Sequence, residues 1–158
     1  MDFASLCRGS DILTLHVPLL PETRHLVGQV AFETMRPGAI LVNTSRGPVV
    51  DTAALLSAFE AGRLARAGID VYEEEPLPPD APLRRQPRVV LTDHMAWYSE
   101  ESQVQLQTSA ARSIVQACRG GLPASMANPE LVARMGRMDE WQPAPCMVWR
   151  LKRLGLLS

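Results

Sequence analysis

The stretch that decides the fold is residues 39–46, AILVNTSR, in which an unbroken apolar run is followed at once by polar residues. Two similar runs follow along the chain: residues 67–69 precede Glu75, and residues 89–91 precede His94. None of the three runs alternates between apolar and polar residues, and such runs are typical of parallel strands covered on both faces. The sequence therefore predicts an α/β fold with a parallel sheet.

Three polar side chains, Arg46, Glu75 and His94, come shortly after these predicted strands. Open parallel sheets bind ligands beyond the carboxyl ends of their strands, so we expect the three to share one site. An arginine can bind a carboxylate with two parallel hydrogen bonds, and a histidine can exchange a proton with a carbonyl oxygen. A glutamate on the other ring nitrogen would set the tautomer and favour the protonated ring. This set suits the reduction of a 2-oxo acid, provided that a cofactor supplies hydride.

Each of these residues also has a purely structural interpretation. Arg46 could be a surface residue of a turn, Glu75 ends an acidic run that alone indicates a solvated patch, and a lone histidine is usually structural. The coincidence of three compatible groups after three successive strands favours the site. Of the competing histidines, His16 is interpreted as a core or rim residue and His25 as a surface residue.

The rest of the chain continues the strand and helix alternation of a doubly wound sheet. We expect strands at residues 12–17, 39–42, 67–70 and 89–92, and helices at residues 30–35, from Asp51 to Gly62 and from Ser99 to residues 120–121. The helix after Asp51 has an apolar stripe of Leu55, Leu56 and Phe59. The last helix is predicted to bury one face, formed by Val104, Ala111, Ile114 and Val115.

Bulk composition is that of an ordinary soluble domain, with 158 residues, 46% hydrophobic and 21% charged. A formal charge of -1 argues against nucleic acid or an anionic membrane as a partner. The sequence lacks a long apolar segment and a signal-peptide pattern, so we expect a cytoplasmic protein. Cys7, Cys118 and Cys146 have no metal-ligand spacing and are interpreted as reduced thiols, with no metal site.

Four segments resemble one family, the D-isomer-specific 2-hydroxyacid dehydrogenases: residues 10–19 (SDILTLHVPL), 21–26 (PETRHL), 41–51 (LVNTSRGPVVD) and 68–76 (GIDVYEEEP). Residues 94–100 (HMAWYSE) are similar to the branch that includes the C-terminal-binding proteins. The resemblance extends over about residues 3–132. It implies the C-terminal half of a Rossmann-type NAD-binding domain.

The family's catalytic Arg, Glu and His fall on Arg46, Glu75 and His94. The resemblance further implies NAD as cofactor, with NADP not excluded. Its implied cofactor contacts are Val17, Thr23, Thr44, Ser45, Arg46, Asp70 and His94, and its implied substrate pocket contains Arg46 and Trp97. Val17 and Thr23 would border the adenosine side, and Asp70 would approach the nicotinamide carboxamide.

The sequence also departs from the family. It contains no G-x-G-x-x-G turn for the pyrophosphate, which we expect to precede residue 1. Asp93 stands where the family commonly has proline, and Met95 stands where a small residue is usual. We expect residues 1–98 to form the half domain, residues 99–132 to return toward the substrate domain, and residues 133–158 to form a tail that the sequence does not place.

These observations predict an NAD-dependent oxidoreductase acting on the CH–OH group of a D-2-hydroxy acid, represented here by a fragment. The expected ligand is a small 2-oxo or 2-hydroxy acid, and the full-length protein is expected to be a homodimer. A non-catalytic regulatory module similar to the C-terminal-binding co-repressors is one alternative, because the fold alone does not decide function. An inactive truncation is another.

Overall fold

The computed structural model describes residues 1–119, 121–123 and 126–127. In chain order the elements are α1 (Phe3–Gly9), β1 (Ile12–Leu15), α2 (Gln29–Thr34), β2 (Ala39–Asn43), η1 (Gly47–Val49), α3 (Thr52–Glu60), β3 (Leu64–Ile69), η2 (Pro82–Arg85), β4 (Val89–Leu91) and α4 (Glu100–Cys118). The chain divides into two compact units, Met1–Trp97 and Tyr98–Ser158.

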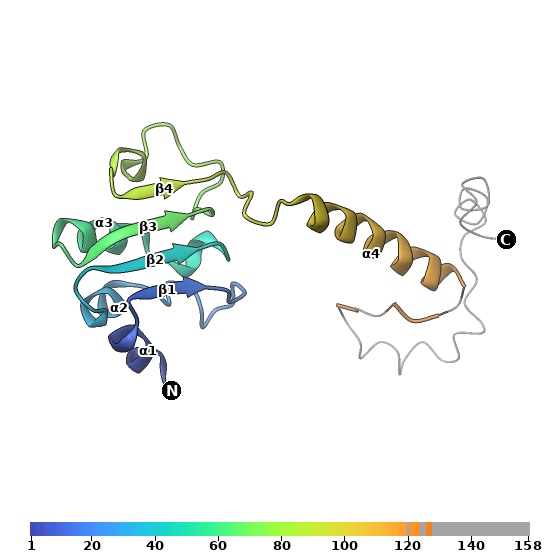
Figure 1. The fold of residues 1–158 in the computed structure, drawn as a ribbon, viewed down its shortest axis with the longest axis horizontal. Helices are drawn as coiled ribbons and strands as arrows, with labels where there is room; N and C mark the ends of the chain where they lie inside the picture. The colour runs from blue at the N-terminus through green and yellow to red at the C-terminus, as the bar shows by residue number, and fades with distance from the viewer. Residues whose placement is uncertain (120, 124–125, 128–158) are drawn as a thin grey trace. The chain divides into compact units, whose positions relative to one another are not determined.

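The four strands of the first unit form one parallel sheet in the order β1-β2-β3-β4. Figure 1 shows their arrows pointing the same way, so all four carboxyl ends lie at one edge of the sheet. In register, Leu13 lies opposite Leu41, Leu41 opposite Ala67, and Ala67 opposite Val89. The predicted parallel α/β sheet is confirmed, and the segments after the strands share one edge.

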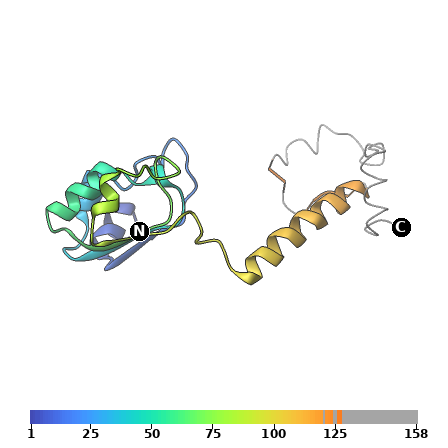
Figure 2. The ribbon, with the colours of Figure 1, turned by 90° about the horizontal axis from the view of Figure 1, so that it is seen from above.

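Helices cover one face of this sheet. In the view from above in Figure 2, the blue-green helix α3 lies on that face. Leu13, Leu41 and Ala67 point into the covered face and are nearly inaccessible, whereas Ile12 is 60% and Val90 66% exposed. The expectation that both faces are covered is therefore wrong for the described residues. Right-handed crossovers between strands added in one direction place α2 and α3 on the same face, and coverage of both faces requires a reversal of strand order.

The core lies between the sheet and these helices. Phe32 of α2, Leu55 and Phe59 of α3, and Leu41 of β2 are at most 2% exposed, and burying each contributes about 1.5–3 kcal/mol. Leu56 packs against this core while partly exposed.

The predicted ends of α3 are also found. The Asp51 carboxylate accepts from the Ala54 N–H at 3.0 Å, and Gly62 adopts the left-handed φ of +67° that follows many helix ends. One short helix, α1, was not predicted. It begins after Asp2, whose carboxylate accepts from the Ser5 N–H at 2.7 Å.

The second unit contains α4, which begins as predicted. Ser99 and Ser102 exchange side chain to backbone hydrogen bonds of 2.8 and 3.1 Å in a capping box. The predicted buried face is wrong in this structure: Val104 is 65% and Ile114 49% exposed, and none of the helix residues is buried. An apolar stripe on a helix becomes buried only when another surface packs against it.

None of the helices in the described part of the chain is long and apolar enough to span a membrane. Among those residues Cys7 is buried and Cys118 half-buried, and neither forms a disulfide. Cys146 and the predicted tail at residues 133–158 lie outside the described residues.

Candidate active site

The turn after β2 is organised by Asn43, whose side chain is 1% exposed. Its Nδ2 donates to the Arg46 carbonyl at 3.0 Å, and its Oδ1 accepts from the N–H and the hydroxyl of Ser45 at 3.1 and 2.9 Å. A buried amide must find partners, and these bonds satisfy it within the turn. The same bonds fix the backbone that presents Arg46.

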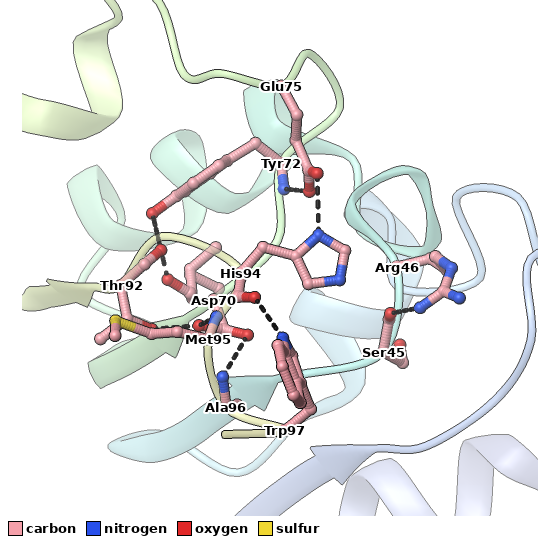
Figure 3. Close-up of polar contacts among 11 residues, drawn as sticks. Ser45, Arg46, Asp70, Tyr72, Glu75, Thr92, His94, Met95, Ala96 and Trp97 are labelled. Carbon is pink, nitrogen blue, oxygen red and sulfur yellow. Dashed lines mark hydrogen bonds and ion pairs between the residues drawn. The ribbon is translucent and has the colours of Figure 1, made fainter. Parts of the chain in front are cut away.

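The Arg46 side chain is exposed at the carboxyl end of the sheet. Its Nη1 donates to the Ser45 carbonyl at 2.7 Å. Figure 3 shows it on the side of the His94 ring that carries Nε2. An arginine has five N–H donors, so a single bond to the backbone leaves the guanidinium able to bind an anion.

The segment after β3 carries Glu75, whose two carboxylate oxygens have different partners. Oε1 accepts from the Tyr72 N–H at 3.1 Å, and Oε2 lies 2.9 Å from Nδ1 of His94. The pKa of Glu75 is lowered, first by the hydrogen bond with His94 and also by the charges of His94 and Arg46. The carboxylate is therefore ionised at neutral pH and accepts a hydrogen bond from the Nδ1–H of His94. Its bond to Nδ1 favours the tautomer in which that nitrogen is protonated.

The segment after β4 holds His94 with a left-handed φ of +50°, an uncommon conformation for a residue with a side chain. Asp70 secures it. The Asp70 carbonyl accepts from the His94 N–H at 2.8 Å, and its carboxylate accepts from the N–H groups of Met95 and Ala96 at 2.9 and 3.0 Å. The Thr92 hydroxyl donates to the same carboxylate at 2.5 Å. Figure 3 shows the contacts of Asp70 to the left of the ring and below it.

Asp70 is 3% exposed, and its pKa reflects two opposing influences. Burial disfavours the charged carboxylate, but the hydrogen bonds from Thr92, Ala96 and Met95 outweigh it and lower the pKa. An ionised, buried carboxylate with this many donors is a rigid anchor. It fixes the backbone on both sides of His94.

Two aromatic side chains complete the surroundings of His94. The Tyr72 hydroxyl donates to the Thr92 carbonyl at 2.5 Å, and burial raises the Tyr72 pKa. The Trp97 indole N–H donates to the His94 carbonyl at 3.1 Å, while the side chain remains 51% exposed. Trp97 therefore lies beside the candidate acid–base group, where the family resemblance implies a substrate pocket.

An open hollow of about 550 Å³ lies beyond the carboxyl ends of β1 and β2. Its lining residues are His16, Val17, Pro18, Leu19, Thr44, Ser45 and Arg46. Four of the predicted cofactor contacts, Val17, Thr44, Ser45 and Arg46, are thus brought together. The crevice beyond the strand ends is where open parallel sheets hold nucleotides.

Two of the other predicted contacts, Thr23 and Asp70, have their side chains engaged within the protein. The Thr23 hydroxyl donates to the Pro18 carbonyl and accepts from the Leu20 N–H, both at 2.7 Å. The Asp70 carboxylate is bonded to the His94 loop as described above. Their cofactor roles remain predictions.

Of the competing histidines, His16 lines the hollow beside Arg46, and His25 pairs with a different glutamate. His16 is exposed just after β1, with its Nε2 2.9 Å from the Thr14 hydroxyl, so it is not a core residue. His25 is exposed, as expected, and pairs with Glu73 at 3.0 Å. The part of the chain that the structure describes holds no cluster of His, Cys, Asp or Glu suited to a metal ion.

Sequence reasoning missed Asn43 and Thr92, which support the site without forming it. A signal was available for Asn43, because an amide directly after a buried apolar strand needs local partners. Thr92 carries no comparable signal, since its partner Asp70 lies 22 positions away.

The arrangement can bind an anion, exchange a proton and hold the proton donor in one orientation. Arg46 supplies the cation and His94 supplies the imidazole ring. Glu75 binds Nδ1 of that ring and so leaves Nε2 facing Arg46. Nε2 of His94 is then the ring atom available to a ligand.

Comparison with known proteins agrees with this geometry. Residues 1–96 match the family described as D-isomer specific 2-hydroxyacid dehydrogenase, NAD binding domain. Glyoxylate reductase of Aeropyrum pernix is 45% identical over 127 residues, which cover 80% of this chain and 38% of that protein. The chain thus spans about two fifths of the length of this curated relative.

Solved structures give the same result. D-lactate dehydrogenase with NAD+ from Lactobacillus jensenii has a TM-score of 0.73 and 30% identity, covering 80% of this chain and 42% of that one. A D-isomer specific 2-hydroxyacid dehydrogenase from Xanthobacter autotrophicus Py2 in complex with NADPH and MES has a TM-score of 0.72 and 33% identity, covering 81% and 52%. The chain belongs to the D-isomer-specific 2-hydroxyacid dehydrogenase family, and its first 96 residues match that family's NAD-binding domain, of which the chain carries the C-terminal half.

Proposed function

We propose that this chain supplies the acid–base and substrate-binding side chains of an NAD-dependent oxidoreductase that interconverts a 2-oxo acid and a D-2-hydroxy acid. The observation that carries the proposal is the 2.9 Å contact between Glu75 Oε2 and His94 Nδ1. This contact leaves Nε2 as the ring nitrogen that gives a proton to the carbonyl oxygen during reduction and takes it back during oxidation.

Arg46 binds the substrate carboxylate in this proposal. Its guanidinium is exposed beside the site and matches a carboxylate with two parallel bonds. Holding the carboxylate there orients the adjacent 2-oxo carbon toward His94. The positive charge also stabilises the negative charge that develops on the carbonyl oxygen.

The dinucleotide would lie in the hollow lined by Val17, Thr44, Ser45 and Arg46. When bound, the nicotinamide supplies the hydride that no side chain can provide. The open shape of the hollow and its place beyond the strand ends fit such a group. Because related structures contain NAD+ in one case and NADPH in another, NAD is our first choice and NADP the alternative.

The substrate is proposed to be a small 2-oxo acid, with glyoxylate the first candidate because a relative that is 45% identical is a glyoxylate reductase. Trp97, exposed next to His94, would line its pocket. We further propose a cytoplasmic homodimer for the protein that carries this chain, with residues 99–132 returning toward a substrate domain. Neither nucleic acid nor a membrane is expected as a direct partner.

The test is NADH consumption by the full-length protein with glyoxylate and with longer 2-oxo acids, followed by the same assay with NADPH. We expect turnover with at least one 2-oxo acid, and we expect the D isomer from the longer 2-oxo acids, whose reduced products are chiral, unlike glycolate. Binding of a protein partner together with no turnover on any 2-oxo acid would favour the co-repressor-like alternative and contradict the proposal.

A further inference from the structure

A second glutamate, Glu73, holds the loop that carries Glu75. Its Oε2 lies 3.0 Å from Nε2 of His25, and its Oε1 accepts from the Thr52 N–H at 2.8 Å. Burial opposes ionisation of Glu73, but the bonds from Thr52 and His25 outweigh it and lower the pKa. Glu73 is therefore a bonded group, and the acidic run is not merely a solvated patch.

Both partners of Glu73 come from segments that adjoin Arg46. The His25 N–H donates to the Pro48 carbonyl at 2.8 Å, two residues after Arg46. Thr52 is the first residue of α3, which follows the same turn. The Glu73 carboxylate thus connects the segment after β3 to His25, which is bonded to the turn after β2, and to Thr52, which follows that turn.

The backbones of these two segments are also in close contact. A Cβ on Gly47 would lie 1.8 Å from the Tyr72 carbonyl oxygen, so only glycine fits between them. This contact sets how near the two segments approach. The contact does not prevent the segment after β3 from sliding along the segment after β2. The bonds of Glu73 to His25 and Thr52 can restrain this motion.

A displacement of Glu73 would be transmitted directly to Glu75. The Tyr72 N–H, in the same residue whose carbonyl meets Gly47, donates to Glu75 Oε1, and Glu75 Oε2 lies 2.9 Å from Nδ1 of His94. Glu75 therefore keeps its orientation only while the Tyr72–Glu73 backbone stays in place. The buried Tyr72 side chain holds this backbone toward Thr92, and the carboxylate of Glu73 holds it toward His25 and Thr52.

We propose that Glu73 is a positioning residue, which bridges His25 and Thr52 and so holds Glu75 where it keeps the proton on Nδ1 of His94. The importance of this positioning for catalysis rests on the proposed function. The positioning itself does not, because it concerns only the ring of His94 in the chain as it stands.

The experiment compares Glu73→Gln with Glu74→Gln in the ¹⁵N-labelled chain of 158 residues. Both changes remove one negative charge, but Glu74 is an exposed neighbour with no bond to His25 or Thr52. The ¹⁵N chemical shifts of the His94 ring report which nitrogen carries the proton in the neutral form. Amide spectra show whether each variant is folded.

In the parent chain and in Glu74→Gln we expect neutral His94 to carry its proton on Nδ1. In Glu73→Gln we expect the Nδ1 resonance to move toward the unprotonated position and the Nε2 resonance toward the protonated one. If Glu73→Gln is folded and its His94 resonances match those of the parent, the inference is wrong.

Should Glu73→Gln fail to fold, His25→Ala provides the second test, because it removes one partner of Glu73 at an exposed position. It should shift the same resonances in the same direction and by less. Unchanged resonances in this variant would overturn the inference. Turnover of the full-length protein is a separate outcome: its absence would contradict the proposed function while leaving the tautomer result intact.

Discussion

Glu75 Oε2 and His94 Nδ1 lie 2.9 Å apart, although 19 positions separate the two residues and they follow different strands. Parallel pairing of β3 with β4 brings the two segments to one edge of the sheet. The contact gives the imidazole a defined tautomer before any ligand binds. Preorganisation of this kind reduces the reorganisation needed when charge develops on a substrate.

Replacing His94 with alanine should raise the pKa of Glu75 toward its ordinary value of 4.5, because the hydrogen bond from His94 is the largest cause of its lowering. A pKa that is lowered in the folded state contributes stability above the unfolded value, and this contribution is lost as pH falls through the folded pKa. The parent chain should therefore lose its stability advantage over His94→Ala below about pH 4.5. Carboxyl ¹³C NMR titration measures the pKa directly, and the same Glu75 value in both proteins would refute this prediction.

Asp70→Asn should lower the free energy of unfolding by about 1–3 kcal/mol, the usual cost of leaving a buried polar group without its partner. The new amide would direct N–H donors at groups that already donate to Asp70, among them the N–H groups of Met95 and Ala96. Urea denaturation measures the change. Asp80→Asn, at an exposed position, is the matched control, and equal stability of the two variants would show that Asp70 is not the anchor inferred here.

Gly47→Ala should also destabilise the chain, by about 1–3 kcal/mol or more, as expected when a side chain is forced into a packed contact. The added Cβ would lie 1.8 Å from the Tyr72 carbonyl oxygen, so the segment that leads to Glu75 must move. Gly9→Ala is the control, because nothing lies within 4 Å of a Cβ there. Thermal unfolding of both variants would decide, and a Gly47→Ala protein as stable as Gly9→Ala would contradict the packing described.

The chain of 158 residues should bind NADH with millimolar affinity or not at all. Its sequence contains no G-x-G-x-x-G turn, and such a turn supplies backbone donors for the pyrophosphate. Losing about 4 kcal/mol of binding weakens affinity roughly a thousandfold. Fluorescence titration with NADH measures this, and micromolar binding would mean that the hollow beside Arg46 holds the cofactor without that turn.

Much of the fold could be predicted because its signals are local. Apolar runs marked the strands, Asp51 and Ser99 marked helix starts, and Gly62 marked a helix end. Coverage of the sheet could not be read in this way, since it depends on the order of the strands and on what packs against them. For the same reason the exposed face of α4 was not anticipated.

The site was predicted in part. The positions of Arg46, Glu75 and His94 after parallel strands indicated convergence, and their catalytic roles remain predictions. The supporting contacts could not be predicted, because Asp70 with Thr92 and His25 with Glu73 are joined across 22 and 48 positions by pairing of whole segments. A local sequence pattern does not predict contacts between residues so far apart in the chain.

The most direct test of the account is a double-mutant cycle on kcat in the full-length protein, with Glu75→Gln, His94→Gln and both together. If the two residues act as one acid–base unit, each single change should lower kcat by about 10²-fold or more, and the double variant should be no slower than His94→Gln alone. Losses that multiply in the double variant, or a His94→Gln enzyme within about twofold of the parent, would contradict the central claim.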